Sequence, residues 1–240
     1  KNLTINGGPY NFANILEKEL VKIGLKKKYL FPDIQLTFST GSFNKFSTNI
    51  LRVDGIYVQN LNNDKIKLNQ KIFKNILLAD GVVFQSKFSK ELIFHYMKKD
   101  KFFDHKKINY KIIGNAFTNQ FFLKNKIKEY NYKYVLMNIT RPSLNKRLKY
   151  ILDAFSILDQ DEYLLLIIGD TFKNIEKKYK NIKFIGNVKN SNIPFYIQRS
   201  DALIHMSKIE SCPNAIVEAL SSGLPVLTNN VGGSRELIKK

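Results

Sequence analysis

Two glutamates separated by seven residues mark the part of this sequence with the clearest chemistry. Glu210 and Glu218 flank the segment "SCPNAIV", whose residues are small, apolar or turn-forming. Pro213 suits the first turn of a helix, Ile216 supplies a buried position, and Gly223 is a typical helix stop. The spacing therefore predicts a helix that begins just after Glu210 and contains Glu218.

This arrangement suits a ligand that carries both hydroxyls and a phosphate. A carboxylate accepts hydrogen bonds only, and it can hold two hydroxyl donors, as in sugar and ribose sites. The N–H groups and the dipole at the start of a helix attract anions. The pattern thus indicates a nucleotide-sugar. On spacing alone, an equally good interpretation makes Glu218 a solvated helix residue and Glu210 a capping group.

Composition limits the class of protein. The chain has 240 residues, 44% of them hydrophobic, with 18 Phe and 12 Tyr, enough for one large globular domain or two ordinary ones. Cys212 is the single cysteine, which excludes an internal disulfide and a Cys-rich metal site. No run approaches the ~20 apolar residues of a membrane span, and the N-terminus lacks the apolar region of a signal peptide. We expect a cytoplasmic protein.

The net charge of +19 comes almost entirely from lysine, because only five arginines occur. Arginine is the better bidentate reader of phosphates and bases, so we expect no nucleic-acid partner. A solvated basic surface is the favoured interpretation. Weak peripheral attraction to an anionic membrane surface, or to another polyanion, stays open.

Short apolar runs alternate with amphipathic segments, which is typical of parallel α/β units. Expected strands lie at 33–38, 50–54, 81–86, 110–115, 134–139, 163–170, 182–186, 202–206 and 225–228, with a first strand at 3–5. Expected helices include 8–23, 146–158, 172–179 and 193–198. The polar segment 123–132 has little apolar periodicity and is expected to be a connector. We therefore predict Rossmann-like domains at 1–126 and 127–240, the second incomplete.

The segment "ESCPNAIVEALSSGLPVLTNNVGGSREL" resembles the C-terminal signature of the retaining glycosyltransferases of family 4, including their E-x7-E pattern. The segments "GGPYNFANILEKEL", "ADGVVFQSKFSKELI" and "IIGNAFTNQFF" resemble earlier features of that family. The resemblance implies the GT-B fold, an α/β fold of two Rossmann-like domains with parallel sheets facing across a cleft. It also implies metal-independent hexosyl transfer with retention, the donor being bound mainly by the second domain and the acceptor by the first.

The same resemblance assigns roles to charged residues. "NITRPSLNKRL" is similar to the family's G-R-x-x-x-x-K element, which implies that Arg141 and Lys146 hold the donor diphosphate. Both also lie between an expected buried strand and a helix, where ligands bind in open α/β sheets. The resemblance implies that Glu210 positions the sugar and Glu218 the ribose.

Further donor contacts follow from the resemblance. "FIGNVKNSNIP" is similar to a loop that contacts the nucleobase mainly through backbone groups. The donor-binding candidates are Gly186, Asn187 and Val188 in this loop, Ser211, Cys212, Asn214 and Ala215 at the helix start, and Gly7 and Gly8, which resemble a loop near the donor phosphate and the acceptor. His205 is either packed at a strand end or contacts the donor.

Asp54, in "RVDGIYV", lies near a position that is often histidine in the family. It either orients or deprotonates an acceptor hydroxyl, or simply caps a loop. We expect a glycosyltransferase that moves a sugar from a UDP- or GDP-sugar to a glycan, lipid or other hydroxyl acceptor, without a further cofactor. The alternatives are a non-catalytic sugar-nucleotide or glycan-binding module, a basic polyanion-binding protein and, more distantly, a sugar-nucleotide 2-epimerase.

Overall fold

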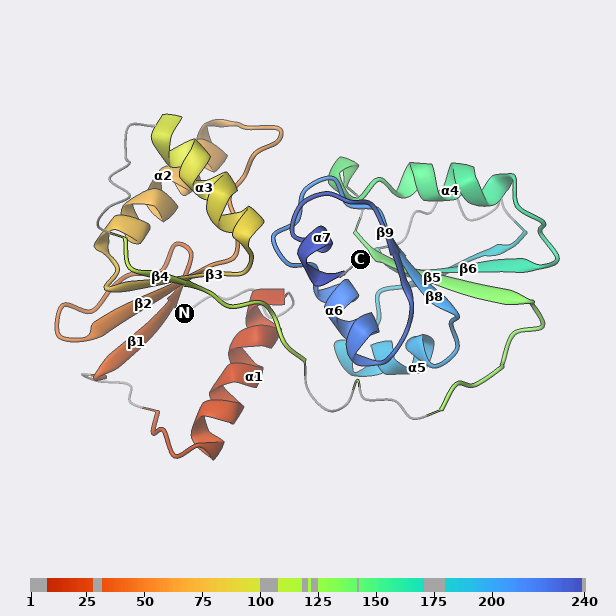
Figure 1. Ribbon diagram of the computed structural model, residues 1–240, viewed down its shortest axis with the longest axis horizontal. Helices are drawn as coiled ribbons and strands as arrows, with labels where there is room; N and C mark the ends of the chain where they lie inside the picture. The colour runs from red at the N-terminus through yellow and green to blue at the C-terminus, as the bar shows by residue number, and fades with distance from the viewer. Residues whose placement is uncertain are drawn as a thin grey trace. The chain divides into compact units, whose positions relative to one another are not determined.

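The chain forms two parallel β-sheets, each in its own unit (Figure 1). A computed structural model describes residues 8–27, 32–99, 108–117, 121, 125–141, 143–170 and 180–238. The chain divides into units 1–115 and 116–240, called here unit 1 and unit 2. The predicted α/β class with two parallel sheets is confirmed.

Unit 1 contains a four-stranded sheet in the order β1-β2-β3-β4. The strands are β1 (Ile34–Phe38), β2 (Thr48–Val53), β3 (Gly81–Phe84) and β4 (Tyr110–Ile112), and the helices are α1 (Gly8–Lys22), α2 (Asn63–Leu78) and α3 (Lys87–Lys99). Leu51 and Val53 of β2 pack with Phe73 of α2 in the core. Arg52, which alternates with them, lies instead against Phe12 of α1, so helices cover both faces.

Unit 2 contains a five-stranded sheet in the order β7-β6-β5-β8-β9. The strands are β5 (Tyr134–Thr140), β6 (Tyr163–Gly169), β7 (Ile182–Gly186), β8 (Ala202–His205) and β9 (Val226–Thr228). The α-helices are α4 (Leu148–Ser156), α5 (Ile193–Ile197), α6 (Asn214–Ser221) and α7 (Ser234–Leu237), and the 3-10 turns are η3 (Leu144–Lys146) and η4 (Asn190–Asn192).

The central strand β6 shows why this sheet is buried on both faces. Leu164 and Leu166 belong to the cluster that includes residues of α5 and α6, whereas Leu165 and Ile167 belong to the cluster formed with α4. All four side chains are buried. A continuous apolar strand of this kind needs helices on both sides, as the sequence predicts.

The division between the units falls at 115/116, eleven residues before the boundary expected from the sequence at 126/127. Two aromatic side chains account for this difference. Phe121 is fully buried in the core of unit 2, and Phe117 packs against the same cluster with its ring 5.1 Å from that of Phe121. The segment before the polar connector therefore belongs to unit 2.

Several expectations fall on residues outside the described ranges. These are the strand at 3–5, Gly7 and the whole helix at 172–179. Within the described ranges, no helix is long and apolar enough to cross a membrane.

Gly169 ends β6 at a point where its backbone meets the end of β5. Its φ is +139°, and a Cβ atom there would lie 1.7 Å from the carbonyl oxygen of Thr140. We expect Gly169→Ala to lower the free energy of unfolding by at least about 3 kcal/mol. Gly223→Ala is the matched control, because Gly223 has φ +71° with nothing within 4 Å of an added Cβ. It should cost only about 1–2 kcal/mol. If urea denaturation showed the same loss of unfolding free energy for Gly169→Ala and Gly223→Ala, the close approach of Gly169 to Thr140 would be contradicted.

Candidate active site

The predicted donor residues lie on two loops at one edge of the unit 2 sheet. One loop follows β5 and contains Arg141 and Lys146, and the other follows β8 and contains Glu210. β5 and β8 are hydrogen-bonded neighbours in parallel register, so their carboxyl ends reach the same edge. This edge is where open α/β sheets bind ligands.

Both oxygens of the Glu210 carboxylate are engaged. The Lys146 ammonium forms an ion pair with Oε1, and the Nε2 atom of His205 lies 2.5 Å from Oε2. The side chains of Lys146 and Glu210 are each 21% exposed, whereas that of His205 is 2% exposed. The His205 ring is therefore packed at the strand end and hydrogen-bonded to Glu210, and its contact with the donor stays a prediction.

The environment keeps Glu210 ionised. Burial alone would raise the pKa of this carboxyl group, but the hydrogen bond from His205 and the charge of Lys146 outweigh it and lower the pKa to about 2. Glu210 is therefore a charged acceptor at any physiological pH. Such a group suits the hydroxyls of a sugar.

The backbone that carries Glu210 is fixed on two sides. The Asn145 side chain donates from Nδ2 to the carbonyl of Ile209 (2.7 Å) and accepts at Oδ1 from the N–H of Ile209 (2.9 Å). On the other side, the N–H of Gly233 donates to the carbonyl of Glu210 (2.8 Å). A Cβ atom at Gly233 would lie 1.7 Å from the carbonyl oxygen of Ser211, so only glycine allows this approach.

Glu218 has the opposite electrostatic setting. It lies in α6, is 5% exposed, and accepts a hydrogen bond from Nδ2 of Asn190 (3.0 Å). Burial raises its pKa to about 7, and the bond from Asn190 offsets this only in part. Glu218 is therefore not a solvated helix residue.

The start of α6 lies between the two glutamates. Pro213 occupies the N-cap position, and among the described residues no side chain forms a capping hydrogen bond there. Cys212 is buried, whereas Ser211, Asn214 and Ala215 are half-buried. The helix start therefore offers backbone groups more than side chains to a ligand.

The remaining donor candidates of unit 2 lie at the same edge. Arg141 follows β5 with an exposed side chain, and its backbone carbonyl accepts a hydrogen bond from Oγ1 of Thr140 (3.3 Å). Gly186 ends β7 with φ +78°. Asn187 hydrogen-bonds the carboxylate of Asp170, which follows β6, and the side chain of Val188 packs against the core. The contact of this loop with a nucleobase through its backbone stays a prediction.

In unit 1, Asp54 belongs to a polar cluster at the carboxyl ends of the strands. Its Oδ1 atom accepts hydrogen bonds from Arg52 and from Nε2 of Gln85 (2.6 Å), while Arg52 also donates to Oδ1 of Asn115 (2.5 Å). Burial raises the pKa of Asp54, and the charge of Arg52 opposes that shift. Gly8 begins α1. Asp54 is thus held by the side chains of Arg52 and Gln85.

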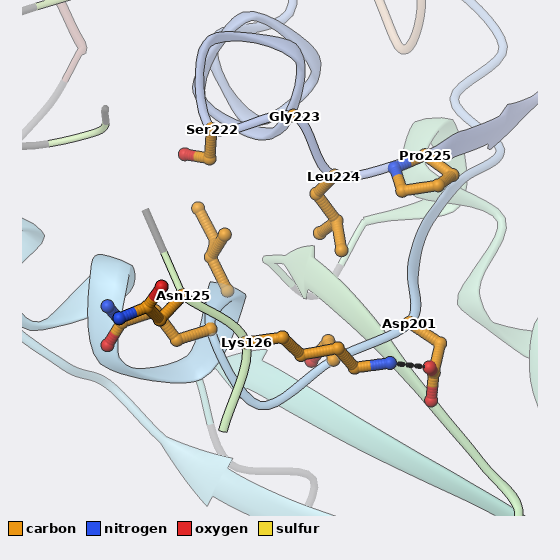
Figure 2. A pocket seen from close by; sticks show the side chains of 10 residues that line it. Asn125, Lys126, Asp201, Ser222, Gly223, Leu224 and Pro225 are labelled. Carbon is orange, nitrogen blue, oxygen red and sulfur yellow. Dashed lines mark hydrogen bonds and ion pairs between the residues drawn. The ribbon is translucent and has the colours of Figure 1, made fainter. Parts of the chain in front are cut away.

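A cavity of about 360 Å³ lies elsewhere in unit 2 (Figure 2). Its lining includes the ion pair between Lys126 and Asp201, together with Leu224 and Pro225. Asp201 precedes β8 and Pro225 precedes β9, so the cavity lies at the amino ends of these strands. It is at the opposite edge from Glu210 and is not part of the predicted donor site.

No metal centre is found in the described part of the chain, where no group of three or more His, Cys, Asp or Glu side chains could hold an ion. Asp159 and Asp161, which spell D-x-D with Gln160, form a turn instead. The Asp159 carboxylate accepts from the N–H groups of Asp161 (2.8 Å) and Glu162 (3.3 Å).

The fold is that of the GT-B glycosyltransferases, with two α/β units that each contain a parallel sheet. Residues 119–240, just over half of the chain, match the family of glycosyl transferases group 1, and the chain belongs to this family.

Three known proteins illustrate the relationship. An uncharacterised 41.2 kDa protein in the cps region of Klebsiella pneumoniae is 34% identical over 110 residues, 44% of this chain and 30% of that protein. The N-acetyl-alpha-D-glucosaminyl L-malate synthase of Bacillus anthracis is 29% identical over 112 residues, 44% of this chain and 29% of the synthase. The structure of Anabaena HepE in complex with UDP-glucose is 18% identical with a TM-score of 0.63, covering 81% of this chain and 56% of HepE. The matches thus span less than a third of each sequence relative.

The two glutamates predict opposite pH effects on stability. The folded-state pKa of Glu218 lies above the ordinary value of 4.5, so the folded protein holds this proton more tightly than the unfolded chain. Stability should fall as the pH rises from about 4.5 to 7, by up to about 3 kcal/mol. In Glu218→Gln this fall should be absent. Urea denaturation across this range measures it, and equal pH slopes for variant and wild type would contradict the raised pKa.

Glu210 should act in the opposite sense. Its folded-state pKa is below the ordinary value, so its contribution is complete above pH 4.5 and is lost as the pH falls toward 2. Glu210→Gln should remove this acid-dependent loss, whereas Glu162→Gln, at an exposed ion pair with Lys133, should leave it unchanged. Thermal melts below pH 5 compare the three proteins. An acid loss that persists in Glu210→Gln would mean that Glu210 is not held by cations.

Proposed function

We propose that this chain transfers a sugar from a nucleotide-diphosphate sugar to a hydroxyl acceptor, with retention of anomeric configuration. The observation that carries the proposal is the contact of Lys146 and His205 with the two oxygens of Glu210, at the strand edge next to α6. Membership of the glycosyl transferases group 1 supports sugar transfer as the reaction class. The complex of HepE with UDP-glucose supports a UDP-sugar donor, with GDP as the alternative base.

Donor binding follows from the charges at this edge. Lys146 has three N–H donors, so it can contact a phosphate oxygen while one donor stays on Glu210. Arg141 is exposed near it and adds a second, planar cation. These two cations and the start of α6 would stabilise the negative charge that develops on the departing diphosphate, which is the task that a metal ion performs elsewhere. We propose a metal-independent hexosyl transfer on this basis.

The two glutamates would hold different parts of the donor. Glu210, already ionised, accepts hydrogen bonds from the hydroxyls of the transferred sugar. Glu218 would take the ribose hydroxyls, and two such donors favour the ionised form of a carboxyl whose pKa is otherwise raised. The helix-start residues Ser211, Asn214 and Ala215 would face the phosphates. The backbone of Gly186, Asn187 and Val188 would contact the nucleobase.

Asp54 is our candidate for the acceptor hydroxyl. Its Oδ1 atom is occupied by Arg52 and Gln85, whereas Oδ2 has no partner among the described residues. The side chain is 23% exposed, so Oδ2 can accept a hydrogen bond or a proton from an incoming hydroxyl. Gly7 and Gly8 would allow close approach of the backbone to the substrates. The acceptor would be a glycan, a lipid-linked sugar or another hydroxyl compound.

The charge of +19 supports a weak peripheral contact with an anionic membrane surface of the cytoplasm, which would bring the chain to a lipid-linked acceptor. We propose no nucleic-acid partner. The arginines, better suited to reading bases, are few.

The proposal is tested with a panel of UDP-, GDP- and ADP-sugars, by following nucleotide release with and without acceptors. Arg141→Ala and Glu210→Gln should each lower turnover about 100-fold or more, because each removes charge stabilisation or sugar positioning. Arg199→Ala and Glu162→Gln are the matched controls, since both residues form ion pairs away from the site. Their turnover should stay within about twofold of wild type, because neither side chain lies at the carboxyl edge of the unit 2 sheet.

Thermal stabilisation by the nucleotide separates the alternatives. A ligand at ~100 times its dissociation constant adds about 2.7 kcal/mol. UDP stabilisation without turnover on any donor would favour a non-catalytic sugar-nucleotide module. Neither stabilisation nor turnover, together with salt-dependent binding to anionic vesicles or DNA, would favour a polyanion-binding protein.

A further inference from the structure

Asn145 joins the two loops that carry Lys146 and Glu210. We infer that Asn145 is a positioning residue that fixes Glu210 relative to Lys146, and that it acts through this pair and not through contact with the substrates. The kinetic part of this inference rests on the proposed function. The structural part does not.

The geometry is a double hydrogen bond between a side-chain amide and one peptide residue. Asn145 donates to the carbonyl of Ile209 and accepts from the N–H of the same residue, at 2.7 and 2.9 Å. The N–H of Lys208 also donates to the backbone carbonyl of Asn145 (2.7 Å). Three hydrogen bonds therefore align the segment 145–146 with the segment 208–210.

The ion pair lies directly beside these bonds. Lys146 follows Asn145, and Glu210 follows Ile209, so each charged residue is one position from the residue that is clamped. Lysine has a flexible four-carbon stem, and its own side chain cannot fix where its ammonium meets the carboxylate. The link between the backbones therefore sets the position of the pair.

Other contacts of Glu210 do not replace this link. His205 belongs to β8, and Gly233 precedes α7, so both hold Glu210 without any connection to the loop after β5. Without Asn145, Glu210 would keep these contacts. It would lose its fixed register with Lys146.

Only an asparagine amide fits this role. Alanine removes the donor and the acceptor together. Aspartate keeps the acceptor for the N–H of Ile209 but places a carboxylate oxygen against the carbonyl of the same residue. Once protonated, the new carboxyl group of Asn145→Asp would again have one donor and one acceptor, which gives the inference a pH-dependent signature.

Steady-state kinetics on the most active donor of the panel test the inference. We expect Asn145→Ala to lower kcat about 10- to 100-fold, because small misplacements of catalytic groups have such effects. KM for the donor should change by less than about threefold, since the charges that bind it remain. In Asn145→Asp, kcat relative to wild type should rise as the pH falls and the new carboxyl group takes up a proton.

Two control variants separate positioning from folding. Asn125→Ala removes an exposed amide at the opposite edge of unit 2, and Ile151→Val weakens the buried face of α4. Both should keep the wild-type kcat per folded molecule. An unchanged kcat in Asn145→Ala would overturn the inference, as would a loss that Ile151→Val reproduces at equal thermal stability.

A double-mutant cycle on stability gives a second test that needs no turnover. If Asn145 positions Glu210, the change in Tm for the variant with Asn145→Ala and Glu210→Gln should be smaller than the combined changes of the single variants. In the variant that combines Asn145→Ala with Glu162→Gln, the change in Tm should equal the sum of the changes in the two single variants. Additivity in both cycles would overturn the inference. A wild-type chain with neither turnover nor stabilisation by UDP would instead overturn the proposed function and leave the cycle as the deciding measurement.

Discussion

Three segments of unit 2 converge on Glu210, and two of them meet its carboxylate. Lys146 reaches it from the loop after β5, and His205 reaches it from the end of β8. Gly233 holds the carbonyl of the same residue from the turn before α7. A buried carboxylate is stable only when it is paired, so the presence of both partners determines how these loops can pack. The charge of Glu210 is therefore a structural constraint as well as the basis of the proposed donor binding.

The two glutamates of this motif lie in different electrostatic environments. Glu210 precedes α6 and is surrounded by a cation and an imidazole, whereas Glu218 lies inside the helix with an amide as its described partner. Glu210 stays charged, whereas burial raises the pKa of Glu218 to about 7 and so favours its neutral form. Hydroxyl donors from a ligand would be new partners for Glu218. In the proposed donor complex, two ribose hydroxyls would supply these partners.

Much of this arrangement follows from local sequence pattern. The apolar runs of β5 and β6 and the amphipathic helix α4 predict a parallel sheet covered on both faces, and the helix between Glu210 and Gly223 was predictable from Pro213 and its apolar spacing. The division at 115/116 did not follow from the local pattern, because Phe117 and Phe121, ahead of the polar connector, pack into the core of unit 2. Contacts that depend on loop geometry were also missed. The sequence shows His205 five residues before Glu210, but only the turn between them brings the ring to the carboxylate. Asn145 and Asn190 carried no signal beyond their position in loops.

We propose that Glu210, Lys146 and Arg141 form a donor site at the carboxyl edge of the unit 2 sheet. A crystal structure of the chain soaked or grown with UDP-sugar tests it most directly. We expect the diphosphate at Lys146, Arg141 and the start of α6, a sugar hydroxyl on Glu210 and the ribose on Glu218. A nucleotide bound in the cavity of Asp201 and Pro225, at the opposite ends of the strands, would contradict it.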